Sequence, residues 1–367
     1  MDHKRNSTAK MRFACAIIFL VFAYTFLACY QADILAVAQH VLSEGKTDYF
    51  YTLAPLLVTF VCFLLQLGVY AVTRVKRRFH GLTYFPSFLL LALIADVPTH
   101  VDAGMSLGWW WLVLPFCLLC WAGVMWVARQ LEPLEQEPHS FGWFSRYSWV
   151  NISQLVVMML AVIFITNNDR LFHERMKMEH LMKEKQYEKA LEVGEKSLQT
   201  DSSLTMLRIA CLYKTGELGS RLFSYPLIGG SQSMYINGTS VKALMWQAPV
   251  WMHGTSPWMK KHRLKYRLSK EYELCALLLD KKLDEFVRKL VKYHELTNLP
   301  THYKEAILLY CHLRTHPIVE FHDNVMDADF ADYQSMERKY SNPVERQSVL
   351  RDTYSNTYWY YYDYGTK

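Results

Sequence analysis

Five apolar runs, each about as long as a bilayer core is thick, lie within the first 165 residues of this chain and constrain its fold more than any other feature. About 20 apolar residues in a helix cross a hydrocarbon core roughly 30 Å thick, and a single segment satisfies its own backbone hydrogen bonds there only as a helix. The sequence therefore predicts a five-helix transmembrane domain over residues 1–165. The predicted spans cover residues 13–30, 53–72, 82–101, 109–127 and 149–165.

Basic residues collect in alternate connections between these runs. Ten Lys and Arg residues lie in the N-terminal segment and the second and fourth connections, whereas the first connection has only Lys46 and the third has none. Since cytoplasmic loops retain Lys and Arg, this pattern places the N-terminus in the cytoplasm. Five spans then put the remaining chain outside. We therefore expect a multi-pass protein of the cytoplasmic (inner) membrane with an extracytoplasmic C-terminal domain.

The first run also has features of a signal peptide. Basic residues precede it, and Cys29 ends a stretch that resembles a loose lipoprotein cleavage site. The run is long, Phe26 stands where such a site normally has Leu, and four further runs already anchor the chain. We expect an uncleaved signal anchor, with lipidation of Cys29 as the alternative.

Residues 166–367 have a different character. Charges are dense there, and apolar positions recur every three or four residues, as is typical of amphipathic helices. This part has 29 Lys and Arg residues against 25 Asp and Glu, a near balance that gives no indication of nucleic-acid binding. We expect an all-α protein whose second domain is soluble and helical. The Trp-rich segment 246–258 and the Tyr-rich end of the chain are predicted to pack in its core.

One stretch of the second domain resembles a tetratricopeptide repeat. In the segment Lys185–Leu198, the aromatic Tyr187 is followed by the small residues Ala190 and Ser197 at the spacing that this family uses. Small side chains at these positions let two antiparallel helices approach closely. The resemblance implies that Ala190 and Ser197 lie where paired helices meet.

A second stretch, Cys211–Leu218, resembles the turn between the helices of such a repeat. It contains Tyr213, Gly216 as a helix stop and Leu218 at the start of the next helix. The two turns lie about 31 residues apart in a family with a period of 34, and a fainter third copy covers residues 272–290. The resemblance implies a groove that binds a protein or peptide. The complete layout resembles bacterial membrane proteins that carry such a domain.

Candidates for catalysis are few. Asp96 is the only acidic residue well within a predicted span, and His100 and Asp102 follow it, so the three could gather around a proton or a metal. Pro98 breaks the helical phase between them, which favours the simpler interpretation that Asp96 ends a helix. The sequence has no paired metal-ligand spacing, phosphate loop, dinucleotide fingerprint or nucleophile elbow, so we expect no cofactor and no metal.

These observations favour a non-enzymatic interaction protein of the cell envelope. Its expected partners are the lipid bilayer and a protein or peptide at the helical domain. The alternative is a membrane glycan or lipid transferase with its active site near Asp96 and His100, and with the helical domain as an accessory.

Overall fold

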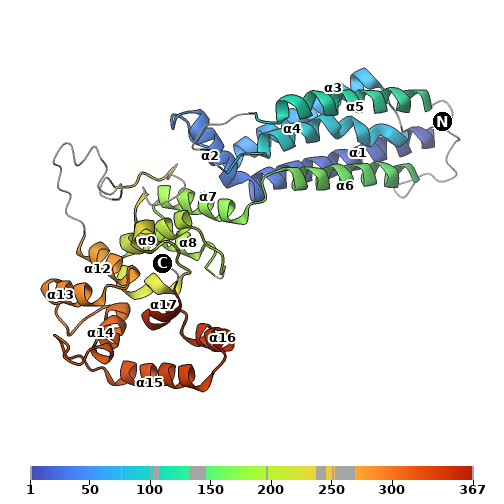
Figure 1. The fold of residues 1–367 in the computed structure, drawn as a ribbon. Coiled ribbons are helices and arrows are strands. Elements are labelled where there is room, and N and C mark those ends of the chain that lie inside the picture. The colour runs from blue at the N-terminus through green and yellow to red at the C-terminus, as the bar shows by residue number, and fades with distance from the viewer. Residues whose placement is uncertain are drawn as a thin grey trace. The chain divides into compact units, whose positions relative to one another are not determined.

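The computed structural model describes residues 2–75, 77–99, 101, 107–131, 146–195, 197–236, 245–249, 252 and 269–365. All regular structure in these ranges is helical, as Figure 1 shows. The chain divides into two compact units, Met1–His173 and Glu174–Lys367, which we call the N-terminal unit and the C-terminal unit.

The N-terminal unit contains five helical segments long and apolar enough to cross a membrane, as the sequence predicted. These segments are Ala9–Tyr30, Leu53–Thr73, Arg78–Ala95, Trp110–Leu131 and Arg146–Ile165. The elements of this unit are α1 (Asp2–Thr25) with the π-helical continuation η1 (Phe26–Tyr30), α2 (Ala32–Leu42), α3 (Leu53–Thr73), the 3₁₀ helix η2 (Arg77–Tyr84), α4 (Phe85–Ala95), α5 (Trp110–Leu131) and α6 (Arg146–Ile165).

Helices α1, α3, α4 and α6 share one apolar core. Phe19 of α1 is wholly buried, and its ring lies 5.2 Å from Phe88 of α4 and 5.1 Å from Tyr84 at the end of η2. Cys62 of α3 and Leu155 of α6 are wholly buried in the same core. Dispersion between these closely packed side chains holds the helices together, because lipid would solvate apolar surface equally well.

Helix α5 is different because only Met125 and Ala128 of its residues are buried. Trp121 attaches it to its neighbours. The indole N–H of Trp121 donates to the Leu82 carbonyl at 2.9 Å, and the ring stacks on Phe85 with 6.5 Å between centroids.

The third apolar segment differs from its predicted range of 82–101. Its helix ends at Ala95, since Val97 precedes Pro98 and the residue before a proline is biased away from helical angles. It also starts earlier, at Arg78, because the polar segment η2 is itself helical and leads directly into α4.

Gly81 explains how the polar segment η2 packs among apolar helices. Its N–H donates to Oδ1 of Asn151 on α6 at 2.5 Å. A Cβ at Gly81 would stand 2.6 Å from Oε1 of Gln154 and 3.0 Å from the Asn151 carbonyl, so the close approach of η2 to α6 requires glycine.

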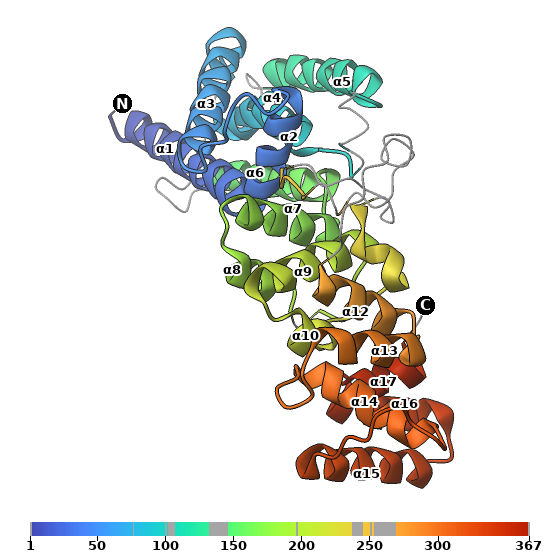
Figure 2. The same cartoon turned by 90° about the vertical axis from the view of Figure 1, so that its left-hand side faces the viewer.

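The C-terminal unit is a series of short helices, which Figure 2 shows following one another as a stack from α7 to α15. Helix α7 begins four residues before the boundary between the units. The elements are α7 (Arg170–Lys183), α8 (Tyr187–Glu192), α9 (Ser202–Thr215), α10 (Leu218–Arg221), the 3₁₀ helices η5 (Leu222–Ser224) and η6 (Gly230–Met234), α12 (Lys270–Leu279), α13 (Leu283–Tyr293), α14 (Thr301–Leu313), α15 (Asn324–Lys339), α16 (Pro343–Tyr354) and α17 (Tyr358–Tyr364).

Three helical hairpins of this unit, α7–α8, α9–α10 and α12–α13, have turns with the same backbone geometry. One residue of each turn has a positive φ: Lys185 (61°), Gly216 (80°) and Lys281 (58°). The next residue donates its N–H to the carbonyl five positions earlier: Gln186 to Leu181 (2.8 Å), Glu217 to Leu212 (2.9 Å) and Lys282 to Leu277 (2.9 Å). This is the bond of a Schellman motif, which ends a helix and reverses the chain.

The residues singled out from the sequence lie close to these turns. Tyr187 opens α8 and is half-buried, whereas Ala190 on the same helix is wholly buried. Leu218 opens α10 and is buried. Tyr213 of α9 makes an edge-to-face contact with Tyr272 of α12 at 5.3 Å, so it joins one hairpin to the next.

Ser197 does not lie on a helix, contrary to its expected place between paired helices. Helix α8 ends at Glu192, Val193 is extended, and Gly194 has a φ of +64°. The chain has therefore turned away before Ser197, whose Oγ accepts the N–H of Gln199 at 3.3 Å.

The aromatic end of the chain packs in the core, as predicted. Tyr358, Trp359 and Tyr361 of α17 are all buried. Trp246 is also buried, whereas Trp251 and Trp258 lie outside the described residues.

The shared turn geometry predicts opposite effects of two substitutions. Gly216→Ala should lower the free energy of unfolding by about 1–2 kcal/mol, because a Cβ is strained in the left-handed region. Apart from the chain next to Gly216, no atom of the described residues lies within 4 Å of that Cβ, so the effect reports backbone strain. Lys185 is exposed at the equivalent position, so Lys185→Gly should raise stability. Denaturant unfolding of the full chain in one detergent measures both. A change of the same sign in the two variants would contradict the shared geometry.

Candidate functional site

Asp96, the first of the sequence candidates, caps the end of α4. Its Oδ2 accepts the indole N–H of Trp110 at 2.7 Å, at an exposed position. The contact joins the end of α4 to the start of α5. His100 and Asp102 lie outside the described residues, so their proposed gathering with Asp96 stays a prediction. Within the described ranges, no group of three His, Cys, Asp or Glu residues is placed to hold a metal.

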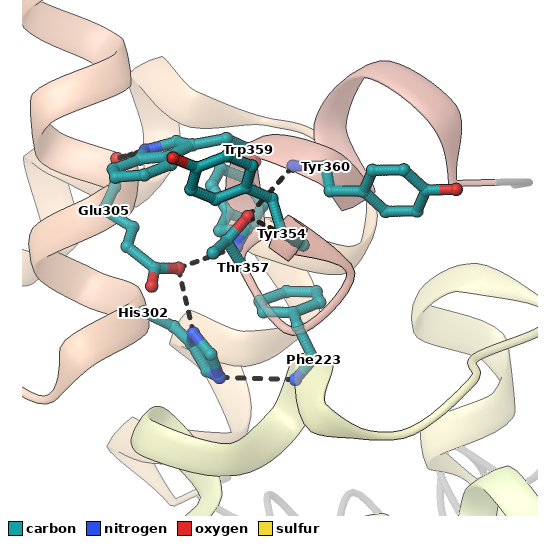
Figure 3. Close-up of polar contacts among 8 residues, drawn as sticks. Phe223, His302, Glu305, Tyr354, Thr357, Trp359 and Tyr360 are labelled. Carbon is teal, nitrogen blue, oxygen red and sulfur yellow. Dashed lines mark hydrogen bonds and ion pairs between the residues drawn. The ribbon is translucent and has the colours of Figure 1, made fainter. Parts of the chain in front are cut away.

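The most chemically suggestive cluster lies in the C-terminal unit, around His302 and Glu305 (Figure 3). Both residues are on the first two turns of α14, three positions apart, so they share one face of the helix. Both are buried, at 2% and 5% exposure. Nδ1 of His302 lies 3.0 Å from Oε2 of Glu305. A buried imidazole beside a carboxylate is the arrangement used by many general bases.

The hydrogen bonds around the imidazole exclude that use. The backbone N–H of Phe223 donates to Nε2 of His302 at 3.3 Å, so Nε2 carries a lone pair and not a proton. The proton is therefore on Nδ1, which donates to Glu305. The Phe223 ring also packs on the imidazole, with 4.9 Å between centroids. Both ring nitrogens are occupied, and no lone pair of this histidine is available to a substrate.

Glu305 connects the same cluster to the end of the chain. Its Oε2 also accepts the N–H of Tyr358 at 2.7 Å, and its backbone carbonyl accepts the indole N–H of Trp359 at 2.9 Å. The Thr357 hydroxyl oxygen accepts the N–H of Tyr360 at 3.3 Å and caps α17 (Figure 3). His302 and Glu305 thus join three segments distant in sequence: η5, α14 and α17.

Buried charges elsewhere in the unit are used in the same way. Arg208 of α9 is wholly buried, and its guanidinium donates to the Gly194 carbonyl at 3.2 Å and to the Thr200 hydroxyl at 3.3 Å. Burial lowers the pKa of Arg208, and the negative charge of Glu174 acts in the opposite direction. This residue was missed from the sequence, although an arginine inside the apolar run of α9 was a visible signal.

Arg175 and Glu179 form a second buried pair, on α7. Nε of Arg175 lies 3.2 Å from Oε1 of Glu179, and Oε2 of Glu179 accepts the N–H of Met245 at 2.9 Å. The pair therefore fixes the backbone of Met245 against α7. A buried ion pair adds little net stability, because removing the two charges from water costs free energy that offsets their attraction.

The thiols of this unit are poor nucleophiles. Burial raises the pKa of Cys211 and of Cys275 to about 12, so both are protonated at neutral pH. Sγ of Cys275 lies 3.4 Å from the hydroxyl of Tyr303, which donates to Glu271. This Cys, Tyr and Glu group therefore packs α12 against α14 and has no activated sulfur.

Comparison with known sequence families gives one match. The family of unknown function DUF6057 matches residues 4–255 and 259–365. The chain belongs to this family. The match spans both units. No curated protein and no solved structure matches the chain.

The free energy of unfolding of two variants tests the role of Glu305. Glu305→Ala should lower the free energy of unfolding by about 3 kcal/mol, since two buried donors lose their acceptor at about 1–3 kcal/mol each. Glu320→Ala removes an exposed carboxylate of the α14–α15 connection and should change stability by less than about 0.5 kcal/mol. Thermal unfolding of the full chain, with limited proteolysis near residue 356, compares the two. Equal stability of the variants would refute the role of Glu305 as a connector.

Proposed function

We propose that this protein is a membrane-anchored interaction protein, in which five apolar helices hold a tetratricopeptide-like array that binds a protein or peptide. The observation that carries the proposal is the set of three hairpins with the same Schellman turn. The turns at Gly216 and Lys185 coincide with the two stretches that resemble the repeat family, and the turn at Lys281 lies in the fainter third copy.

A repeated hairpin is suited to binding and not to chemistry. Each hairpin buries its apolar face against the next, and the stacked helices present a continuous surface to partners. The contact of Tyr213 with Tyr272 supports such stacking between successive hairpins. Helices of this kind offer backbone and side chains at regular spacing, which favours recognition of an extended peptide or of another helix.

The ionisable groups of the described residues also favour binding over catalysis. His302 and Glu305 use their polar atoms on one another and on backbone groups, and Asp96 accepts from an indole that has no acid–base role. A membrane transferase requires acidic groups that face a cavity open to its substrate. The interaction protein is therefore the function that these contacts support best.

The charge asymmetry completes the proposal. Ten Lys and Arg residues in the N-terminal segment and alternate connections, against one in the others, support an N-terminus in the cytoplasm and a C-terminal unit outside it. The expected partner is then an envelope protein or a peptide segment of one.

In-cell crosslinking tests this function directly. The full chain, a chain ending at His173 and Asp96→Asn are expressed at equal abundance in native cells, crosslinked through lysine and purified from membranes. Crosslinks to other proteins should start from exposed lysines of the C-terminal unit, such as Lys189 and Lys214. They should persist in Asp96→Asn, which retains the side-chain shape.

The truncated chain serves as the control for crosslinks made through the apolar helices. Partners that remain bound to the chain ending at His173 would contradict an interaction role for the C-terminal unit. Loss of these crosslinks in Asp96→Asn would favour the transferase alternative.

A further inference from the structure

An apolar cavity of about 330 Å³, largely open to the outside, lies in the N-terminal unit, between η2 and the last turns of α5. Its lining residues are Phe79, Gly123, Val124, Val127, Ala128 and Leu131. The volume falls in the range of small-molecule sites, which is about 300–1,000 Å³. The lining is wholly apolar, so a ligand must insert a hydrocarbon group.

Gly123 shapes this cavity without serving the packing of the protein. Apart from the backbone of its own helix and its chain neighbours, no atom of the described residues lies within 4 Å of the position that its Cβ would occupy. A glycine inside a helix weakens that helix relative to alanine, so its presence there usually reflects close packing against a neighbour. At Gly123 the open space faces the cavity instead. Trp121, two residues earlier on α5, fixes the helix to Leu82 and Phe85.

Two exposed arginines are sequence neighbours of residues that line the cavity. Arg78 precedes Phe79, and its guanidinium lies 5.8 Å from the Phe79 ring centroid. Arg129 follows Ala128 in the last turn of α5 and is exposed. No acidic residue occurs in the sequence 70–95 or 107–131, and Glu132 is the first one after Arg129. The sequence next to the lining residues has five basic residues, Arg74, Lys76, Arg77, Arg78 and Arg129, against the three acidic residues Glu132, Glu135 and Glu137, so its net charge is positive.

We infer that this cavity binds an anionic glycerophospholipid, with one acyl chain in the slot and the phosphate near Arg78 and Arg129. An apolar slot beside arginines at the end of a membrane-spanning helix matches the two parts of such a lipid, and basic pockets between helices recognise anionic headgroups. The inference is independent of the partner of the C-terminal unit.

Native mass spectrometry of the purified full chain tests the site. The detergent-solubilised protein is offered equal amounts of phosphatidylglycerol and phosphatidylcholine with the same acyl chains. We expect one retained phosphatidylglycerol per chain, preferred by about 25-fold, because each arginine near a headgroup contributes about five-fold. Arg78→Gln and Arg129→Gln should each reduce the preference about five-fold. Gly123→Trp should fill the slot and abolish retention of both lipids.

Matched variants control for general disturbance of the helices. Gly68→Trp also places an indole at an open helical glycine, on α3, and Arg146→Gln removes an exposed charge at the start of α6. Both should bind as the unaltered chain does. Equal retention of the two lipids by the unaltered chain, or unchanged binding by Gly123→Trp, would overturn the proposal. A preference that survives both arginine substitutions would overturn it as well.

Discussion

The contact between Gly81 and Asn151 is the constraint on which the N-terminal unit depends. Backbone groups that leave an α-helix among apolar neighbours have no water to bind, so a polar 3₁₀ segment such as η2 needs partners from the protein. Asn151 supplies one by accepting the N–H of Gly81, and its own Nδ2 donates to the Tyr147 carbonyl at 2.7 Å. The absence of a side chain at Gly81 allows the approach. With η2 fixed on α6, Phe79 lies beside α5 and lines the apolar cavity.

The C-terminal unit is organised by backbone hydrogen bonds of another kind. Left-handed residues at three equivalent turns reverse the chain, and only one of them is the glycine that this conformation favours. Lys281 has a second function, since its Nζ donates to the carbonyl of Gly365 at 2.9 Å and so helps to hold the end of the chain. Together with His302 and Glu305, this contact makes the last helix part of the core. The side chains most suited to chemistry are thus used to fix the architecture.

The length of the apolar runs, the helical periodicity and the resemblance to a repeat family predicted the features that depend on local sequence. The five apolar segments, the helical second half and the stop at Gly216 all follow from residues within a few turns of one another. The end of α4 at Ala95 was also readable, since Pro98 and Asp96 mark a helix end. The helical conformation of η2 was not, because its polar residues resemble a connection and its partner Asn151 is 70 positions away.

The residues of the candidate site also differ in how much of their role the local sequence indicated. Asp96 was visible as a charged residue in an apolar run, but its contact with Trp110 required the fold. His302 and Glu305 stand three positions apart in the sequence, whereas their other partners are backbone groups of Phe223 and Tyr358, which carry no sequence signal. Ser197 was misplaced because the turn at Gly194 depends on the room beside Glu174, where a Cβ would overlap the carboxylate.

We propose that the membrane helices display the C-terminal unit on the outer side of the cytoplasmic membrane. Reporter fusions measure this most directly, with an enzyme that is active only outside the cytoplasm fused after Lys367 or after Arg78. The charge asymmetry predicts activity for the fusion after Lys367 and none for the fusion after Arg78. Activity of a cytoplasm-only reporter at Lys367 would contradict the account, because an even number of spans would then separate the two ends of the chain.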